Sequence, residues 1–88
     1  MIPCIYPNHG LFYATQEEVE RLDTLKTMGD AISAQLKAHG EKTRSNPTPK
    51  NIEVYDWMEM QDVKLTFAYV DLLQKIQLRN QIERELNG

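Results

Sequence analysis

The sequence predicts an all-α fold, an antiparallel helical hairpin that follows an irregular aromatic N-terminal arm. Residues 51–86 contain neither Gly nor Pro, the two residues that most disfavour the interior of a helix. Residues 15–39 carry the capping and spacing signals of a second, shorter helix. The chain has 88 residues, a net charge of −3 and one cysteine, which suits a single small domain, residues 1–88, without an internal disulfide.

Residues 1–14 are the predicted arm, because Pro3, Pro7 and Gly10 interrupt regular structure. The arm is nonetheless rich in rings, namely Tyr6, His9, Phe12 and Tyr13. A frayed terminus is usually polar, so these rings predict that the arm is held against an apolar surface. We expect it to pack over the helix pair; the alternative is that its rings form an aromatic wall for a flat ligand.

The first helix is predicted for residues 15–39. Thr15 and Glu18 have the spacing of a capping box, in which each side chain accepts a hydrogen bond from the other residue's backbone N–H. The apolar stripe comprises Val19, Leu22, Leu25, Ile32 and Leu36. Gly29 lies in line with this stripe and costs about 1 kcal/mol relative to Ala, which is tolerable where another backbone comes close. Gly40 predicts the end of the helix.

A polar loop is predicted for residues 40–50, which include Pro47 and Pro49. Thr48 caps the second helix if Pro49 is its first residue, and Asn51 is the alternative cap. Packing of the two helices within one chain predicts an antiparallel hairpin.

The second helix, residues 51–86, has two apolar rows at helical spacing. The first row comprises Val54, Trp57, Met58, Leu65, Ala68, Tyr69, Leu72 and Ile76. The second row comprises Met60, Val63, Phe67, Val70, Leu78 and Ile82. One row packs on the first helix, whereas the second row and the overhanging residues 75–86 need a further neighbour. The helix therefore predicts a homo-oligomer.

Composition and motifs argue against several classes of function. The acidic balance and the lack of a basic patch do not suit a DNA or RNA polymer as partner. No apolar run reaches the length of a membrane span, and the N-terminus lacks the pattern of a signal peptide. Cys4, His9 and His39 are too few and too scattered to predict a nucleophile or a metal site. We expect neither an enzyme nor a cofactor.

Two segments of the first helix carry a family resemblance. Residues 15–19, Thr-Gln-Glu-Glu-Val, and residues 25–29, Leu-Lys-Thr-Met-Gly, resemble the first helix of phage anti-CBASS cyclic-nucleotide sponges and the related hairpin of Thoeris anti-defence sponges. That family has a Ser/Thr-x-Glu-Glu-Ile/Val start, followed by Ile/Leu-Lys-x-x-Gly. The second helix is similar at Trp57, Met58, Leu65, Tyr69, Leu72, Leu73 and Ile76. The resemblance covers residues 11–76.

The resemblance implies a helical homohexamer that binds cyclic dinucleotide second messengers, cGAMP-like molecules, without cleaving them. It implies action in the cytoplasm of the infected bacterial host, where sequestering the messenger blocks CBASS signalling. The family's phosphate-contacting lysine corresponds to Lys26, followed by Gly29 of the same motif. The family's base-stacking tyrosine falls at Leu11 when counted without gaps, so Phe12 or Tyr13 must take its place.

Some family members also bind cyclic trinucleotides through two hydroxyl residues and an arginine. Those positions hold Met28, Asp62 and Val63 here. A carboxylate repels phosphate, and the two apolar side chains accept no hydrogen bond, so we expect trinucleotide capture to be lost or greatly weakened. The alternative to a nucleotide sponge is a helical oligomer whose arm and long helix bind a host or phage protein.

Overall fold

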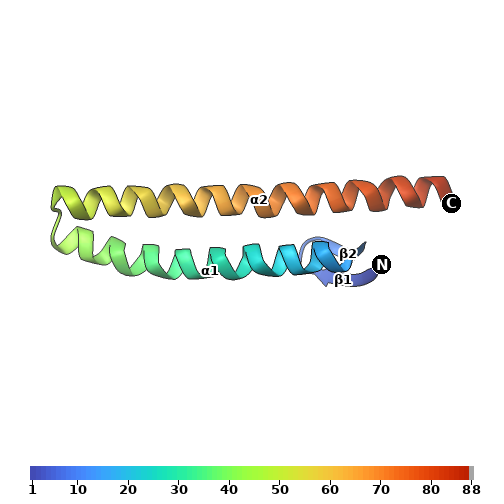
Figure 1. The fold of residues 1–88 in the computed structure, drawn as a ribbon, viewed down its shortest axis with the longest axis horizontal. Helices are drawn as coiled ribbons and strands as arrows, with labels where there is room; N and C mark the ends of the chain where they lie inside the picture. The colour runs from blue at the N-terminus through green and yellow to red at the C-terminus, as the bar shows by residue number, and fades with distance from the viewer. Residues whose placement is uncertain (88) are drawn as a thin grey trace.

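The computed structural model describes residues 1–87 as a helical hairpin joined to a small β-hairpin (Figure 1). The elements are β1 (Ile2–Tyr6), β2 (Gly10–Ala14), α1 (Gln16–Ser45) and α2 (Pro49–Asn87). The two helices run antiparallel along a body of 59 × 21 × 16 Å, as the hairpin prediction required. α2 extends past the start of α1, and the β-hairpin lies at that end.

The prediction of an irregular arm, and with it the all-α fold, is wrong for the first fourteen residues. β1 and β2 pair antiparallel, with Cys4 opposite Phe12. Pro7 and Asn8 form the turn, in which His9 N–H donates to the Tyr6 carbonyl at 3.1 Å and Asn8 has a φ of 71°. Proline followed by a residue with positive φ is the pattern of a tight type II turn. Of the residues taken as breakers, Pro7 belongs to the turn, whereas Pro3 lies within β1 and Gly10 is the first residue of β2.

α1 begins as predicted and ends later than predicted. Thr15 is the N-cap and forms both bonds of the capping box with Glu18. Gly40 does not end the helix, which continues to Ser45. The ring of Tyr55 from α2 packs so close that a Cβ on Gly40 would lie 3.1 Å from it. Gly40 therefore serves close packing between the helices.

The connection between the helices is three residues, 46–48, rather than the predicted loop of residues 40–50. Of the two alternative caps, Thr48 is the one used, because its Oγ1 accepts from Asn51 N–H at 3.2 Å. Asn51 instead ties the turn together: its Nδ2 donates to the Asn46 carbonyl at 2.8 Å. The Asn51 carbonyl accepts from Thr43 Oγ1 at 3.3 Å and lies 3.1 Å from the ring of His39.

The core lies at the β-hairpin end of the molecule. It is built from β2, the start of α1 and the later part of α2, through Phe12, Ala14, Leu22, Leu73 and Ile76. The alternation of a strand turns Phe12 and Ala14 inward and leaves Leu11 and Tyr13 outside. Residues 75–86 were expected to be buried on another chain, but Ile76 and Asn80 are already buried within this one.

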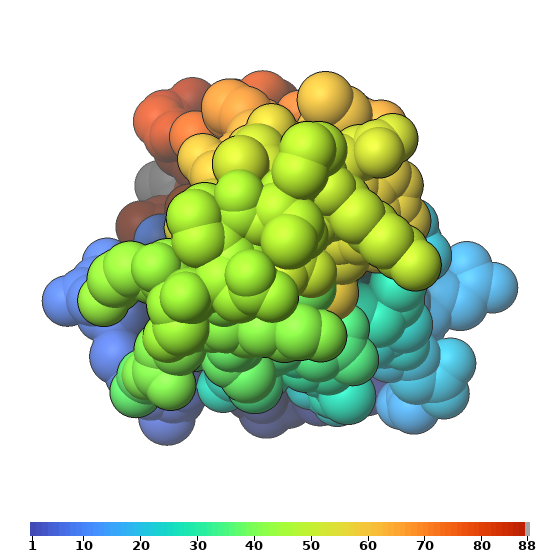
Figure 2. Space-filling view, turned by 90° about the vertical axis from the view of Figure 1, so that its left-hand side faces the viewer, coloured from blue at the N-terminus to red at the C-terminus, as the bar shows by residue number. Residues whose placement is uncertain are grey.

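The outer side of α2 is uncovered in one copy of the chain. Met60, Val63, Phe67 and Val70 are all exposed, whereas Ile76 on the opposite side is fully buried. Trp57, a member of the first apolar row, is 58% exposed and does not pack in the core. Figure 2 looks along the helices from the turn, and α2 (yellow to orange) forms the upper edge of the view. Within residues 1–87, neither helix has the length and apolarity needed to cross a membrane.

Candidate functional site

An open groove of about 250 Å³ lies between the two helices. From α1 it is lined by Leu25, Lys26, Gly29, Asp30 and Ser33. From α2 it is lined by Asp62, Leu65, Thr66 and Tyr69. The groove therefore combines an apolar floor, a ring, hydroxyl groups and charges of both signs, which is the mixture expected of a small-molecule site.

Gly29 keeps this groove open. A Cβ built on Gly29 would have no atom within 4 Å, so no neighbouring backbone comes close. The predicted reason for this glycine, close backbone approach, is wrong. An empty space beside a helical glycine leaves room that a ligand can occupy, at a cost of about 1 kcal/mol in helix stability relative to Ala.

The charges in the groove are mixed. Lys26 is the cation, and Asp30 and Asp62 are the carboxylates. Ser33 Oγ donates to Asp62 Oδ1 at 3.2 Å, which ties the two walls together. A lysine attracts phosphate, whereas carboxylates accept hydrogen bonds from exocyclic amino groups and ring N–H groups of bases.

Tyr69 connects the groove to the core. Burial, with a smaller contribution from the nearby Asp23, raises the pKa of its hydroxyl. Burial, followed by the neighbouring Tyr69 and Asp23, raises the pKa of Tyr6 in the same way. Tyr6 also packs edge-to-face on Phe12, with ring centroids 5.1 Å apart. Both hydroxyls are therefore neutral near pH 7 and able to donate a hydrogen bond.

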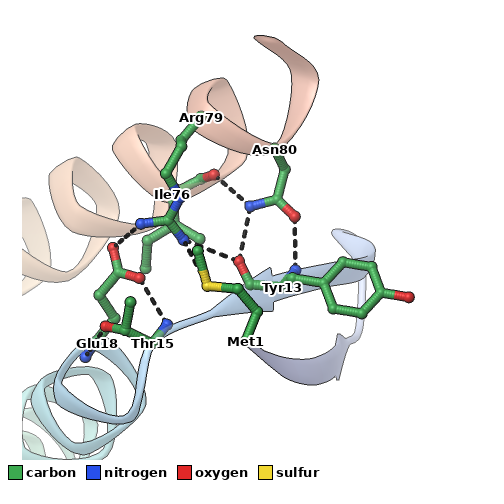
Figure 3. Close-up of polar contacts among 7 residues, drawn as sticks. All are labelled: Met1, Tyr13, Thr15, Glu18, Ile76, Arg79 and Asn80. Carbon is green, nitrogen blue, oxygen red and sulfur yellow. Dashed lines mark hydrogen bonds and ion pairs between the residues drawn. The ribbon is translucent and has the colours of Figure 1, made fainter. Parts of the chain in front are cut away.

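A second cluster of polar side chains fixes β2 against α2 (Figure 3). Asn80 Oδ1 accepts from Tyr13 N–H at 2.6 Å, and Asn80 Nδ2 donates to the Tyr13 carbonyl at 2.7 Å. The same Nδ2 donates to the Ile76 carbonyl at 2.7 Å. The amide of Asn80 thus pairs with the strand as a neighbouring strand would, and it satisfies backbone groups that are costly to leave unpaired.

Arg79 reinforces this cluster and joins it to α1. Its guanidinium contacts Glu18 Oε2 at 2.7 Å and donates to the Tyr13 carbonyl at 3.0 Å. Burial by itself raises the pKa of the Glu18 carboxyl, but hydrogen bonds from the Thr15 N–H and Arg79 outweigh it, so the pKa of Glu18 lies below 4.5. The cap of α1 is therefore also an anchor for α2.

This cluster holds the backbone of Tyr13 while its ring points away from it (Figure 3). Tyr13 as a residue is 46% exposed, and it borders a hollow of about 510 Å³. The other residues around this hollow are Leu11, Asn80, Glu83, Arg84 and Asn87. An exposed ring on a fixed backbone, with an arginine on the same hollow, suits a flat anionic group.

The five predicted ligand-binding residues fall into three places. Lys26 and Gly29 line the groove between the helices, and Leu11 and Tyr13 line the hollow at the β-hairpin end. Phe12 is 2% exposed and belongs to the core, so the prediction that it offers its ring to a ligand is wrong. Because side chains alternate along β2, Phe12 is buried and Tyr13 is exposed, so Tyr13 is the one of the two candidate rings that a ligand can reach.

Met28, Asp62 and Val63 stand where the resembling family has its trinucleotide-binding residues, and the structure places them apart from one another. Asp62 lies in the groove with Lys26. Val63 faces the outer side of α2, in a hollow with Asp56, Glu59 and Met60. Met28 is exposed on α1. Among the three, Asp62 is therefore the one positioned to affect a ligand in the groove.

The sequence analysis missed several residues of the groove and of the polar cluster that joins β2 to α2. It placed Tyr69 on an apolar row, and it singled out neither Ser33 nor Thr66. It also missed Asn80, although this amide stands four residues after Ile76, on the buried side of α2. A polar side chain at a position expected to be buried signals a specific hydrogen-bond partner.

The fold and these two places define a small helical-hairpin protein with a candidate ligand groove. Scans against protein-family models, curated proteins and solved structures find no match to this chain. In the described part of the chain, residues 1–87, the His, Cys, Asp and Glu side chains form no cluster of three or more suited to a metal ion.

Proposed function

We propose that this protein is a homo-oligomer that binds cyclic dinucleotides and sequesters them without cleavage. The observation that carries the proposal is the position of Lys26, the residue singled out by the resemblance to anti-CBASS sponges, in an open groove between α1 and α2. In an infected bacterial cell, such binding withdraws the messenger of an antiphage system and so blocks its signalling.

The chemistry of the groove supports a nucleotide rather than a simple anion. One lysine faces two carboxylates there, so a free phosphate gains little net attraction. A nucleotide also offers base N–H groups, which Asp30 and Asp62 can accept, and hydroxyl groups of Ser33 and Thr66 can contact its sugar and phosphate.

The separation of Lys26 from Tyr13 supports a site shared between copies. Ten residues of helix, about 15 Å, separate Lys26 from the first residue of α1, and Tyr13 lies beyond that residue on a different hollow. A ligand contacted by both side chains bridges two protomers, one supplying Lys26 and the other supplying Tyr13 and Arg84. A cyclic dinucleotide is close to two-fold symmetric and can meet such a pair of contacts twice.

Calorimetric titration with a cyclic dinucleotide tests the proposal. Lys26→Ala and Tyr13→Ala should each weaken binding about tenfold or more, because a charge-assisted contact or a base stack contributes roughly 1.5–3 kcal/mol. Lys37→Ala is the matched control: it removes an exposed lysine of the same helix that does not line the groove. No heat of binding for the unmodified protein, or equal affinity in all three variants, would overturn the proposal.

Two further measurements define the activity. Chromatography of the ligand after incubation and heat release should recover it intact, and a linear or shortened product would show that the protein is an enzyme. Titration with a cyclic trinucleotide should show much weaker binding than the dinucleotide, because the trinucleotide carries a third phosphate, whose negative charge Asp62 repels. Comparable affinity for both ligands would contradict the proposed selectivity.

The alternative function, capture of a host or phage protein, is favoured by a different observation. The outer side of α2 exposes an apolar row that the chain itself does not cover. Such a row is typical of a surface that binds another helix. Whether its occupant is a second copy of the chain follows from the charges that flank it.

A further inference from the structure

The exposed row on α2 has the spacing of a coiled-coil seam. Met60, Val63, Phe67 and Val70 follow one another at steps of three, four and three residues. Phe67 and the fully buried Ile76 are nine residues apart, which places them on opposite sides of the helix. The row therefore points directly away from the core, and Phe67 is 69% exposed.

Heptad positions follow from this spacing. If Met60 and Phe67 are a positions, Val63 and Val70 are d positions. Asp56 stands at the d position before the row and Gln74 at the a position after it. Polar residues at both ends limit the apolar seam to about three helical turns.

The charges beside the seam are complementary for one arrangement. Glu59 stands at a g position and Lys64 at the e position five residues later. In a parallel coiled coil, a g residue meets the following e residue of the other helix, so Glu59 meets the partner's Lys64 on both sides. Within residues 1–87 neither side chain forms an ion pair, so both are available. Ile52 and Trp57 have the same g-to-e spacing, and both are exposed.

The antiparallel arrangement is less favourable. If two antiparallel copies of α2 cross at residue 65, the seam residues again form apolar layers, with Met60 opposite the partner's Val70 and Val63 opposite the partner's Phe67. This arrangement brings Lys64 beside the partner's Lys64, however, and leaves Glu59 on the other edge. Like charges in contact are destabilising. The parallel register also has one such contact, between the two Asp56 side chains at the exposed end of the seam, but it gains two Glu59–Lys64 attractions. The antiparallel register has the Lys64 contact and no such attraction, so the flanking charges favour the parallel register.

We infer that the outer side of α2 pairs with the same surface of a second copy, parallel and in register, through Met60, Val63, Phe67 and Val70. Each copy contributes six exposed apolar side chains, the four of the seam together with Ile52 and Trp57. Their contact buries on the order of 1,000 Å², near the lower limit for specific interfaces. A hollow of about 350 Å³ beside Met60 and Val63 offers room for a side chain of the partner. This inference adds surface and orientation to the proposed oligomer and does not depend on nucleotide binding.

Disulfide crosslinking tests the orientation. The test protein carries Cys4→Ser, which removes the single cysteine, together with Val70→Cys. In the parallel register the two residues 70 face each other, so mild oxidation should convert most of the protein to a covalent dimer. In the antiparallel register they are about 15 Å apart along the axis, beyond the reach of a disulfide. Ala34→Cys, on the exposed side of α1, is the control for random collision.

A charge swap provides a second, independent readout. Glu59→Lys or Lys64→Glu should each weaken association about three- to tenfold in sedimentation equilibrium, because each change replaces an attraction by a repulsion. The double variant should recover the original association. In the antiparallel arrangement residue 64 meets its own counterpart and Glu59 lies on the other edge. Neither single variant would then weaken association by this amount, and that result would overturn the parallel register.

The outcomes separate this inference from the proposed function. A monomer in sedimentation, or an oligomer in which Val70→Cys crosslinks no better than Ala34→Cys, overturns the parallel seam even if nucleotide binds. A covalent dimer together with absent nucleotide binding supports the seam and refutes the nucleotide function instead.

Discussion

The two ends of the helical hairpin are held together in different ways. At the β-hairpin end, three elements meet around a fully buried core that includes Leu22 and Ile76. At the turn end, the contacts are polar bonds around Asn51 and the packing of Tyr55 on Gly40, and the residues there are half-buried at best. The difference teaches that a two-helix hairpin needs a third layer to bury side chains completely, and only one end has it.

The strongest test of this contrast is truncation of an apolar side chain at each end. Ile76→Ala removes a fully buried side chain and should lower the free energy of unfolding by about 2–5 kcal/mol. Val54→Ala, at a half-buried position near the turn, should cost about 1 kcal/mol. Urea denaturation at one protein concentration measures both. Equal losses would mean that the two ends are equally well packed.

The two asparagines allow a second comparison, between polar contacts. Asn80→Leu removes the amide partner of the Tyr13 N–H and one of the two partners of the Tyr13 carbonyl at a partly buried site, which should cost about 1–3 kcal/mol. Asn51→Ala should cost less than about 1 kcal/mol, because water can replace its exposed bond to Asn46. Hydrogen exchange of the Tyr13 amide gives a local readout: it should become faster in Asn80→Leu and stay unchanged in Asn51→Ala.

Acid should weaken the β-hairpin end selectively. The pKa of Glu18 is lower in the folded protein than its ordinary value of 4.5. The stabilisation from this carboxylate is therefore complete above about pH 4.5, and it is lost as the pH falls through the lower folded pKa.

Thermal unfolding of the unmodified protein and Glu18→Gln tests this pH dependence. Glutamine keeps the capping box but removes the charge facing Arg79, at a cost of about 1 kcal/mol near pH 7 for a partly exposed pair. The difference in melting temperature should shrink toward zero as the pH is lowered through that range. A constant difference would show that the charge contributes nothing.

The smallest expected effect compares the two glycines of α1. Gly29→Ala meets no atom within 4 Å and should raise the free energy of unfolding by about 0.5–1 kcal/mol. Gly40→Ala should raise the free energy of unfolding by less, because the added methyl would lie 3.1 Å from the Tyr55 ring. If the groove binds a nucleotide, Gly29→Ala should also weaken that binding, so that stability and affinity change in opposite directions. Unchanged affinity would place the ligand away from Gly29.

Local signals in the sequence were sufficient for part of this structure. The Thr15–Glu18 capping box and the unbroken second helix depend on residues within one or two helical turns of each other. The cap of the second helix was narrowed to Thr48 or Asn51, and the structure selects Thr48. The β-hairpin also had a local signal, since Pro7, Asn8 and Gly10 separate two short apolar runs. That signal was missed because the same residues are equally typical of an irregular segment.

Other features were decided by contacts between residues far apart in the chain. The strand register turned Phe12 into the core and Tyr13 outward, the Tyr55 ring made Gly40 a packing residue, and Asn80 joined α2 to β2. The groove around Lys26 likewise needs both helices in their observed register. Spacing along one helix states which residues share a face, but the partner of each face depends on tertiary packing. The sequence predicted that the second apolar row of α2 needs a further neighbour, and the structure shows that Met60, Val63, Phe67 and Val70 are exposed in one copy of the chain. For the overhanging residues, only tertiary packing showed that Ile76 and Asn80 are already buried against β2 and α1.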